Sequence, residues 1–158
     1  MQIGFKTAIL LLTAGFAATV AASERYVERI GVPNGQVVVV SEGDDEAQAN
    51  GSYTVRLYDA EHMAYRSGVI VVRNGALESV ALGDLQRNGT EQVVVVLRQG
   101  PGVRSAQAFS ISGNRVEVRS HIEDLPDDAD PVALLTKTTR SDKLFGRGKY
   151  HDPNSGAR

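Results

Sequence analysis

Few side chains in this sequence have the types and spacing that catalysis requires. The 158 residues include no cysteine and three histidines, His62, His121 and His151. None of the three stands in a metal-ligand spacing such as H-E-x-x-H. The sequence has neither a G-x-S-x-G motif around a serine nucleophile nor the glycine-rich loops that bind nucleotide phosphates. We therefore expect no metal, no nucleotide and no other cofactor.

Paired carboxylates are the remaining route to catalysis, as in glycoside hydrolysis. Residues 44–46 and 123–130 are the two acidic segments that could supply such a pair. Acidic runs without hydrophobic periodicity are usually solvated loops. We interpret residues 42–50 as a surface loop, and we expect that the protein is not an enzyme.

One acidic loop has the outline of a calcium site. The segment from Asp84 to Glu91 resembles a D-x-D-x-D-G loop, in which alternate side-chain oxygens bind one hard cation. Two of the three carboxylates are replaced by the neutral side chains of Gln86 and Asn88, and Arg87 adds a positive charge. The loop therefore predicts a turn without a bound metal.

The strongest candidate for recognition is the segment from Arg98 to Arg104. It follows the most apolar run of the chain, so a rigid strand would present a protruding Gly-Pro-Gly tip. The two flanking guanidinium groups would suit the carboxylates of a partner's cleft. An ordinary connection between two strands is the alternative. The candidate partner-binding residues are Arg98, Gly100, Pro101, Gly102, Val103 and Arg104.

The elements that must position this segment are β-strands. Seven runs with strand-like patterns span residues 36–41, 52–59, 67–73, 76–82, 91–98, 105–112 and 115–121. Asn74-Gly75 predicts a type I′ hairpin between two of them, and Gly113-Asn114 predicts another turn. The run 91–98 is apolar on both faces, as in a central strand that is covered on each side. Short connections favour an all-β antiparallel sandwich or flattened barrel of about seven to eight strands.

The two ends of the chain differ from this domain. Residues 1–22 combine a basic start, an apolar stretch and small residues, which predicts a cleaved signal peptide and a periplasmic or secreted protein. Residues 23–136 carry 10 Lys and Arg against 17 Asp and Glu, whereas residues 137–158 carry 6 against 2. We expect a single all-β domain over 23–136, closed by one or two helical turns that Asp130 caps, and a basic flexible tail over 137–158.

Residues 50–120 resemble the periplasmic inhibitors of invertebrate-type (I-type) lysozyme. The resemblance is carried by Gly51 to Tyr58, by Asp84 to Glu91 ahead of Val93 to Val96, and by the glycine-rich loop that leads into Ser105 to Phe109. It implies a β-sandwich or barrel-like domain, usually dimeric, that inserts a loop into the acidic active-site cleft of a lysozyme. That loop typically carries a serine and a tyrosine around glycines in the family.

Two functional hypotheses follow from the sequence. The first is an exported lysozyme inhibitor that inserts Gly100 to Val103, with Arg98 and Arg104 paired to acidic residues of the lysozyme, so that salt weakens inhibition. The alternative is an envelope structural or adaptor protein tethered through residues 137–158. A net charge of −2 gives no overall attraction to nucleic acid. Valine-rich strands on an exposed edge would aggregate, so a covered edge or a homodimer is expected, with 37–40 one candidate edge.

Overall fold

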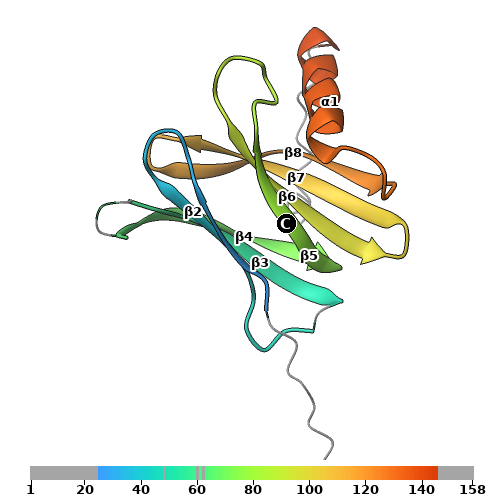
Figure 1. The fold of residues 1–158 in the computed structure, drawn as a ribbon, viewed down its shortest axis with the longest axis horizontal. Helices are drawn as coiled ribbons and strands as arrows, with labels where there is room; N and C mark the ends of the chain where they lie inside the picture. The colour runs from blue at the N-terminus through green and yellow to red at the C-terminus, as the bar shows by residue number, and fades with distance from the viewer. Residues whose placement is uncertain (1–24, 48, 60, 62, 146–158) are drawn as a thin grey trace, which may run out of the picture.

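The fold is a two-layer β-sandwich with one helix on its outer side (Figure 1). The structure is a computed structural model that describes residues 25–145 except 48, 60 and 62, with side chains up to residue 139. The N-terminal sheet has the order β1 (Val27–Gly31), β2 (Val37–Glu42), β3 (Asn50–Tyr58), β4 (Tyr65–Asn74). The C-terminal sheet has the order β5 (Ala76–Gly83), β6 (Gln92–Gly100), β7 (Val103–Ser112), β8 (Arg115–Leu125), and α1 (Pro131–Phe145) follows.

This architecture confirms the predicted antiparallel sandwich with a C-terminal helix. Every pair of neighbouring strands is antiparallel, and the two sheets of the described residues do not close into a barrel. The strand missing from the seven sequence-predicted ones is β1. Its five residues include Glu28 and Arg29, so it lacks the continuous apolar or alternating pattern that identifies a strand in a sequence.

The main hydrophobic core lies between the two sheets. Tyr53, Val55 and Leu57 are fully buried there, which confirms the alternation predicted for this strand. The ring of Tyr53 packs edge-on against Phe109 of the opposite sheet, with 6.2 Å between the ring centroids. Burial raises the pKa of Tyr53, and its hydroxyl donates a hydrogen bond to Gln107 Oε1 at 2.6 Å.

A second core lies between the C-terminal sheet and α1. Val94 and Val96 of β6 are buried in it together with Leu135 of the helix, whereas Val93 and Val95 face the inter-sheet core. The prediction that residues 91–98 form a central strand covered on both faces is therefore confirmed. A continuous valine run is the sequence pattern that such a doubly covered strand requires.

The predicted hairpin at Asn74-Gly75 is wrong. The strands before and after it, β4 and β5, belong to different sheets. A type I′ turn needs a positive φ at both central residues, and only Gly75 has one (φ 103°). Its amide donates to Ala49 O at 2.6 Å, which extends the β3–β4 ladder. A side chain at Gly75 would collide with the backbone of Arg98, so this glycine allows the chain to cross between the sheets.

The helix begins as predicted and is longer than expected. Asp130 Oδ1 accepts hydrogen bonds from the amides of Val132 and Ala133 at 3.0 and 3.2 Å, the geometry of an N-cap, with Pro131 as the first helical residue. Instead of one or two turns, α1 continues to Phe145, so it includes the first part of the predicted tail 137–158.

Both ends of the domain division remain predictions. The signal peptide predicted over 1–22 and residues 146–158 lie outside the described residues. A boundary at residue 136 would fall inside α1, which begins at Pro131 and ends at Phe145. Among the described residues there is no helix with the length and hydropathy that crossing a membrane requires.

Candidate binding site at the β6–β7 turn

The candidate recognition segment forms the hairpin turn between β6 and β7. Gly100 pairs with Val103, so only Pro101 and Gly102 lie between the last paired residues of the two strands. Pro101 followed by Gly102 at φ 73° has the sequence and the positive φ of a type II turn. The expected protruding loop from Arg98 to Arg104 is therefore a tight turn, because the strands continue pairing almost to the tip.

The tip of the turn is exposed to solvent. Pro101 and Gly102 are exposed, and Val103 retains 37% of its accessible surface. A side chain added at Gly100 or Gly102 would meet no other atom within 4 Å. The ladder shifts register between Arg98 and Gly100, and such a bulge increases local twist and re-aims the end of a hairpin. The turn is therefore a small, uncharged projection that is free to contact another molecule.

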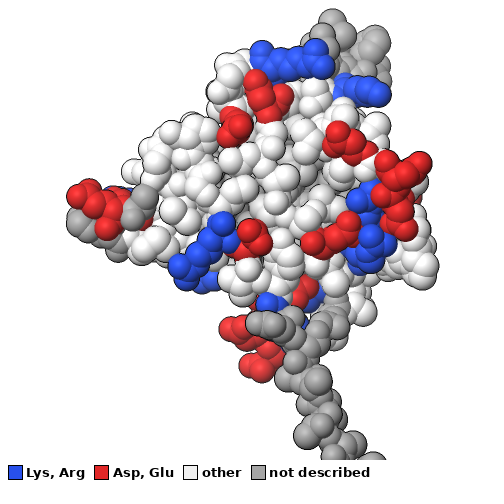
Figure 2. Space-filling model, viewed as in Figure 1, with Lys and Arg blue, Asp and Glu red and all other residues white. Residues whose placement is uncertain are grey.

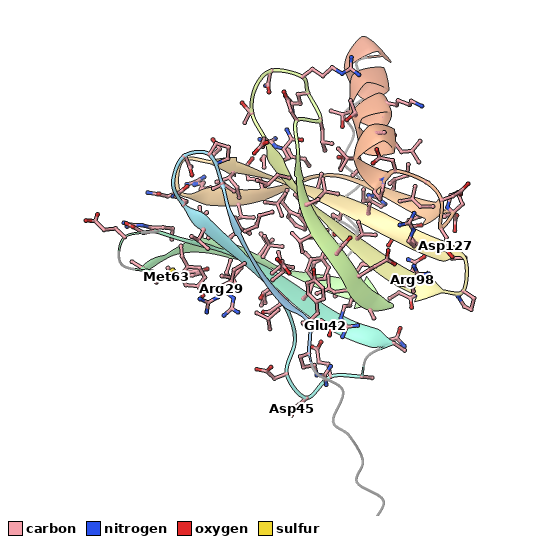
Figure 3. The ribbon with its side chains drawn as sticks, viewed as in Figure 1. Arg29, Glu42, Asp45, Met63, Arg98 and Asp127 are labelled. Carbon is pink, nitrogen blue, oxygen red and sulfur yellow. The ribbon has the colours of Figure 1, made fainter. Side chains whose placement is uncertain are left out.

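The two flanking arginines lie opposite each other and are held by carboxylates of the same chain. Arg98 Nη2 is 2.8 Å from Glu78 Oε2, and Arg98 Nη1 is 2.9 Å from Asp127 Oδ1. The hydrogen bond with Asp127, followed by the nearby charges, raises the pKa of Arg98. Figure 3 shows Arg98 and Asp127 at the same edge of the molecule. The side chain of Arg98 remains 43% exposed.

Arg104 is the buried member of the pair. Its side chain is 9% exposed, and its Nη2 donates to Pro126 O at 2.8 Å and to Ala129 O at 2.7 Å. Its Nη1 lies 3.3 Å from Glu78 Oε1. This guanidinium therefore connects β7 to β5 and to the segment that leads into α1. From these contacts we infer that Arg104 holds the β6–β7 turn in place.

Sequence reasoning did not identify the two carboxylates of this cluster. Glu78 is the one charged residue in β5, where the ladder also shifts register next to it, and Asp127 lies in a segment interpreted as a solvated loop. An acidic residue inside an otherwise uncharged strand was the available signal, because such a residue is usually paired when it is partly buried. Figure 2 shows the resulting mixture of positive and negative side chains at this edge.

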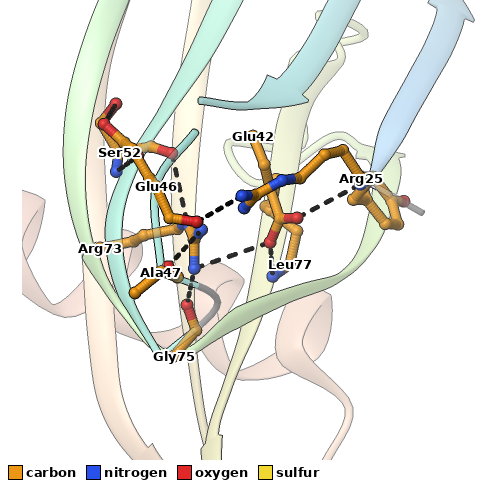
Figure 4. A network of polar contacts seen from close by, with 9 residues as sticks. Arg25, Glu42, Glu46, Ala47, Ser52, Arg73, Gly75 and Leu77 are labelled. Carbon is orange, nitrogen blue, oxygen red and sulfur yellow. Dashed lines mark hydrogen bonds and ion pairs between the residues drawn. The ribbon is translucent and has the colours of Figure 1, made fainter. Parts of the chain in front are cut away.

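A second polar network lies beside the turn (Figure 4). Arg73 and Glu42 are both buried, with 3.6 Å between Nη1 and Oε1. Glu42 also accepts hydrogen bonds from the amides of Tyr26 (3.2 Å) and Leu77 (3.1 Å), and Arg73 donates to the carbonyl oxygen of Gly75. The interpretation of residues 42–50 as a surface loop is therefore wrong at both ends: Glu42 ends β2 and joins the two sheets, and Asn50 begins β3.

In the calcium-like loop, the carboxylate accepts hydrogen bonds from backbone amides. Asp84 Oδ1 accepts from the amide of Asn88 at 3.1 Å, and Oδ2 accepts from the amide of Gly89 at 2.7 Å. These bonds, that from Gly89 foremost, lower the pKa of Asp84. No group of three or more potential metal ligands occurs among the described residues. The aspartate thus stabilises the turn ahead of β6.

Comparisons with known proteins agree with this fold. The family model PliI, described as periplasmic lysozyme inhibitor of I-type lysozyme, matches residues 24–139. The crystal structure of PliI-Ah, the periplasmic lysozyme inhibitor of I-type lysozyme from Aeromonas hydrophyla, is 29% identical with a TM-score of 0.66, over 70% of this chain and 98% of that one. A comparison with curated proteins gave no match.

A second solved structure shows the relative with its target. This crystal structure of Aeromonas hydrophila PliI in complex with Meretrix lusoria lysozyme is 31% identical to the chain, with a TM-score of 0.63, over 70% of this chain and 94% of that one. The resemblance carried by residues 50–120 thus extends over nearly the whole domain. The chain belongs to the family of periplasmic lysozyme inhibitors of I-type lysozyme, whose members are inhibitors and not enzymes.

Proposed function

We propose that this protein binds an I-type lysozyme in the periplasm and inhibits it without chemical reaction or cofactor. The observation that carries the proposal is the family match over residues 24–139. The relative crystallised in complex with a lysozyme supports it, because that relative shares 31% identity and a TM-score of 0.63 with this chain.

The β6–β7 turn is the surface that we assign to the lysozyme. It is exposed and uncharged at its tip, and its base is fixed by Arg104, which is hydrogen-bonded to two carbonyl groups. A rigid tip loses little conformational entropy when it enters a cleft. Gly100 to Val103 would fill the active-site cleft and exclude the substrate.

The two arginines would then have different roles. Arg98 is 43% exposed and lies next to the tip, so it can exchange Asp127 for a carboxylate of the lysozyme at small cost. Arg104 is 9% exposed and bonded within the chain. We therefore assign contact with the lysozyme to Arg98 and positioning of the turn to Arg104.

The experiment is a titration of I-type, chicken-type and goose-type lysozymes with the chain that lacks the predicted signal peptide, following lysis of peptidoglycan. We expect stoichiometric inhibition of the I-type enzyme. Pro101→Glu places a negative charge at the tip, which an acidic cleft would repel, and should weaken inhibition at least about tenfold.

The matched control is Asn114→Glu in the β7–β8 turn. Asn114 is also an exposed turn residue, but it lies at the other end of β7, a ten-residue strand and thus about 33 Å away. It should leave inhibition unchanged. If Asn114→Glu abolishes inhibition and Pro101→Glu does not, the assignment of the β6–β7 turn is wrong. If no lysozyme is inhibited, the proposed function itself is wrong.

A further inference from the structure

The outer face of the N-terminal sheet carries most of the exposed hydrophobic side chains of the described residues. The outer face of the C-terminal sheet is covered by α1 (Figure 1), and the N-terminal sheet has no such cover in the part of the chain that the structure describes. Six large hydrophobic side chains are exposed among the described residues. Four of these six lie on this outer face: Val27, Tyr65, Ile70 and Val72.

The register of β3 and β4 places the two most exposed of them. Thr54 points away from the inter-sheet core, because Tyr53 and Val55 on either side of it are fully buried there. Ile70 pairs with Thr54, and Val72 follows two residues later on the same face. Ile70 and Val72 are 76% and 86% exposed. Neighbouring exposed hydrophobic side chains of this kind mark a surface that meets a protein or a membrane.

Two arginines lie on the same face. Arg29 of β1 pairs with Val39, and Val39 pairs with Arg56 of β3, so the Cα atoms of the two arginines are about 10 Å apart. Val39 is only 5% exposed, as expected where the apolar stems of its two arginine neighbours lie over it. The four strands contain two acidic residues, Glu28 and Glu42, and both alternate to the inward side. The strands therefore give this face positive charge only.

Neither of these arginines is paired with a carboxylate of the described residues. Arg56 Nη2 donates to Ser41 Oγ at 3.0 Å. On the outer face of the C-terminal sheet, Arg119 Nε donates to Ser110 Oγ at 2.7 Å in a similar way, but its Nη2 also lies 2.9 Å from Glu117 Oε2. A serine-bound arginine is thus neutralised on the outer face of one sheet and remains able to bind an anion on the other.

Arg56 is packed together with an aromatic side chain. A side chain added at Gly68 would come within 3.2 Å of Arg56 Cγ and 3.3 Å of the Tyr65 hydroxyl, so both residues lie over this glycine. The ring of Tyr65 also packs edge-on against Tyr58, with 5.9 Å between the ring centroids. Tyrosine is enriched where proteins meet the boundary between lipid and water. The face therefore combines cationic, aromatic and aliphatic groups.

We propose that the outer face of the N-terminal sheet docks onto an anionic lipid surface. The guanidinium groups of Arg29 and Arg56 bind lipid phosphates through several donors, and Ile70 and Val72 enter the boundary between headgroups and acyl chains. A lipid surface supplies the anionic and the apolar groups together. The net charge of −2 gives the chain no overall attraction to such a surface, so the local arrangement of charge carries the interaction.

Docking through this face is compatible with the proposed inhibition and does not depend on it. The β6–β7 turn belongs to the other sheet, and Figure 3 shows Arg29 well apart from Arg98. A chain docked on lipid therefore keeps this turn accessible to a lysozyme.

Co-sedimentation with vesicles tests the docking. The chain that lacks the predicted signal peptide should bind vesicles of phosphatidylethanolamine with about 30% phosphatidylglycerol and should not bind vesicles of phosphatidylcholine. Arg29→Gln with Arg56→Gln should weaken this binding about 30-fold, a factor of about five for each arginine. The difference should disappear at high salt, because salt screens the attraction between exposed charges.

The matched control is Arg87→Gln with Arg119→Gln. It removes the same charge from the β5–β6 loop and from the outer face of the C-terminal sheet, and it should leave vesicle binding unchanged. Ile70→Thr with Val72→Thr keeps β-branched side chains in the strand and should weaken binding at least about tenfold at every salt concentration, because it removes apolar contacts. Circular dichroism should show an unchanged fold in all three variants.

Three results would overturn the docking. The first is no binding to the phosphatidylglycerol vesicles at millimolar lipid, the second is equal binding to phosphatidylcholine, and the third is an Arg29→Gln, Arg56→Gln variant that binds as well as the control. Inhibition is measured without vesicles, where this variant should inhibit like the original chain. If the variant loses inhibition and the original chain binds no vesicles, the face belongs to the contact with lysozyme and the lipid proposal is wrong.

Discussion

Two arginine–carboxylate networks brace the end of the sandwich where β4 passes into β5, and they differ in burial. In the first, Arg73 and Glu42 have side chains that are 0% and 4% exposed. In the second, Arg98 and Asp127 are 43% and 52% exposed. The two networks meet at Gly75, which accepts a hydrogen bond from Arg73 and lies against the backbone of Arg98.

The difference in burial separates a pair that can only stabilise the fold from one that remains accessible to a binding partner. Separating a buried ion pair leaves a charge without compensation, so the Arg73–Glu42 pair is fixed. An exposed pair contributes little to stability and can exchange partners. The Arg98 cluster is therefore the one to which we assign the proposed contact with a lysozyme. Arg104 is intermediate between these two cases, because its own side chain is buried although the cluster to which it belongs is otherwise exposed.

Glu42→Ala should have the largest effect on stability. It leaves the Arg73 guanidinium buried without this carboxylate and removes the acceptor of two backbone amides. We expect a loss of about 3–5 kcal/mol in the free energy of unfolding, measured by urea denaturation. Asp44→Ala in the adjacent exposed segment is the control and should change little. Equal effects of both variants would contradict the assigned role of burial.

Arg104→Ala should have the next largest effect. Its loss leaves the carbonyl oxygens of Pro126 and Ala129 without their donor, and we expect about 2–3 kcal/mol of destabilisation by urea denaturation. Arg104→Lys should restore only part of it, because one ammonium group cannot replace a planar guanidinium with several donors. If the lysine variant is as stable as the original chain, the multiple contacts of Arg104 are not important.

Arg98→Ala should separate binding from stability. Because Arg98 is exposed, the urea midpoint should move less than in Arg104→Ala, whereas the inhibition constant for an I-type lysozyme should rise about tenfold. This rise should be smaller at higher salt, since screening weakens the exposed charge pair in the original complex. An unchanged inhibition constant at low salt would remove Arg98 from the contact surface.

Glu46→Gln should have the smallest effect on stability, and the size of this effect should depend on pH. Its carboxylate accepts hydrogen bonds from the amide and the hydroxyl of Ser52, which lower its pKa below the ordinary value of 4.5. A lowered pKa in the folded state means that ionised Glu46 stabilises the fold above pH 4.5 and loses this effect as pH falls through the folded pKa. The stability difference between the original chain and Glu46→Gln should therefore shrink on acidification.

The control for this prediction is Asp84→Asn. Asp84 also has a lowered pKa, for the same kind of reason, and lies in the β5–β6 loop. Urea denaturation should show that each variant differs less in stability from the original chain below pH 4 than at neutral pH. A difference for Glu46→Gln that is constant with pH would exclude ionised Glu46 as a stabilising group.

The parts of the fold that sequence reasoning predicted are those with a local physical cause. Alternation placed Tyr53, Val55 and Leu57 inside, the valine run identified β6 as doubly covered, and the Asp130-Pro131 pair located the start of α1. In each case the pattern follows from which faces of one element are buried, or from which backbone groups its first turn leaves unpaired.

The errors concern pairings between distant residues. Asn74-Gly75 has the sequence of a hairpin, but Gly75 is needed for a close approach to Arg98, 23 positions away in the sequence. Glu42 looks like the start of a solvated acidic run, yet its carboxylate faces Arg73 and the amide of Leu77. A local stretch of the sequence does not contain these contacts. The residues come together only because the two sheets pack against each other.

The sequence by itself determined the all-β class, the C-terminal helix cap and the segment that forms the β6–β7 turn, since these depend on periodicity and on residues close in the chain. Only the tertiary structure decided that Arg98 and Arg104 have internal carboxylate partners, that β2 is an inner strand and that β4 is an edge strand. Strand order and charge pairing depend on which sheets pack together, and many orders satisfy the same alternating pattern.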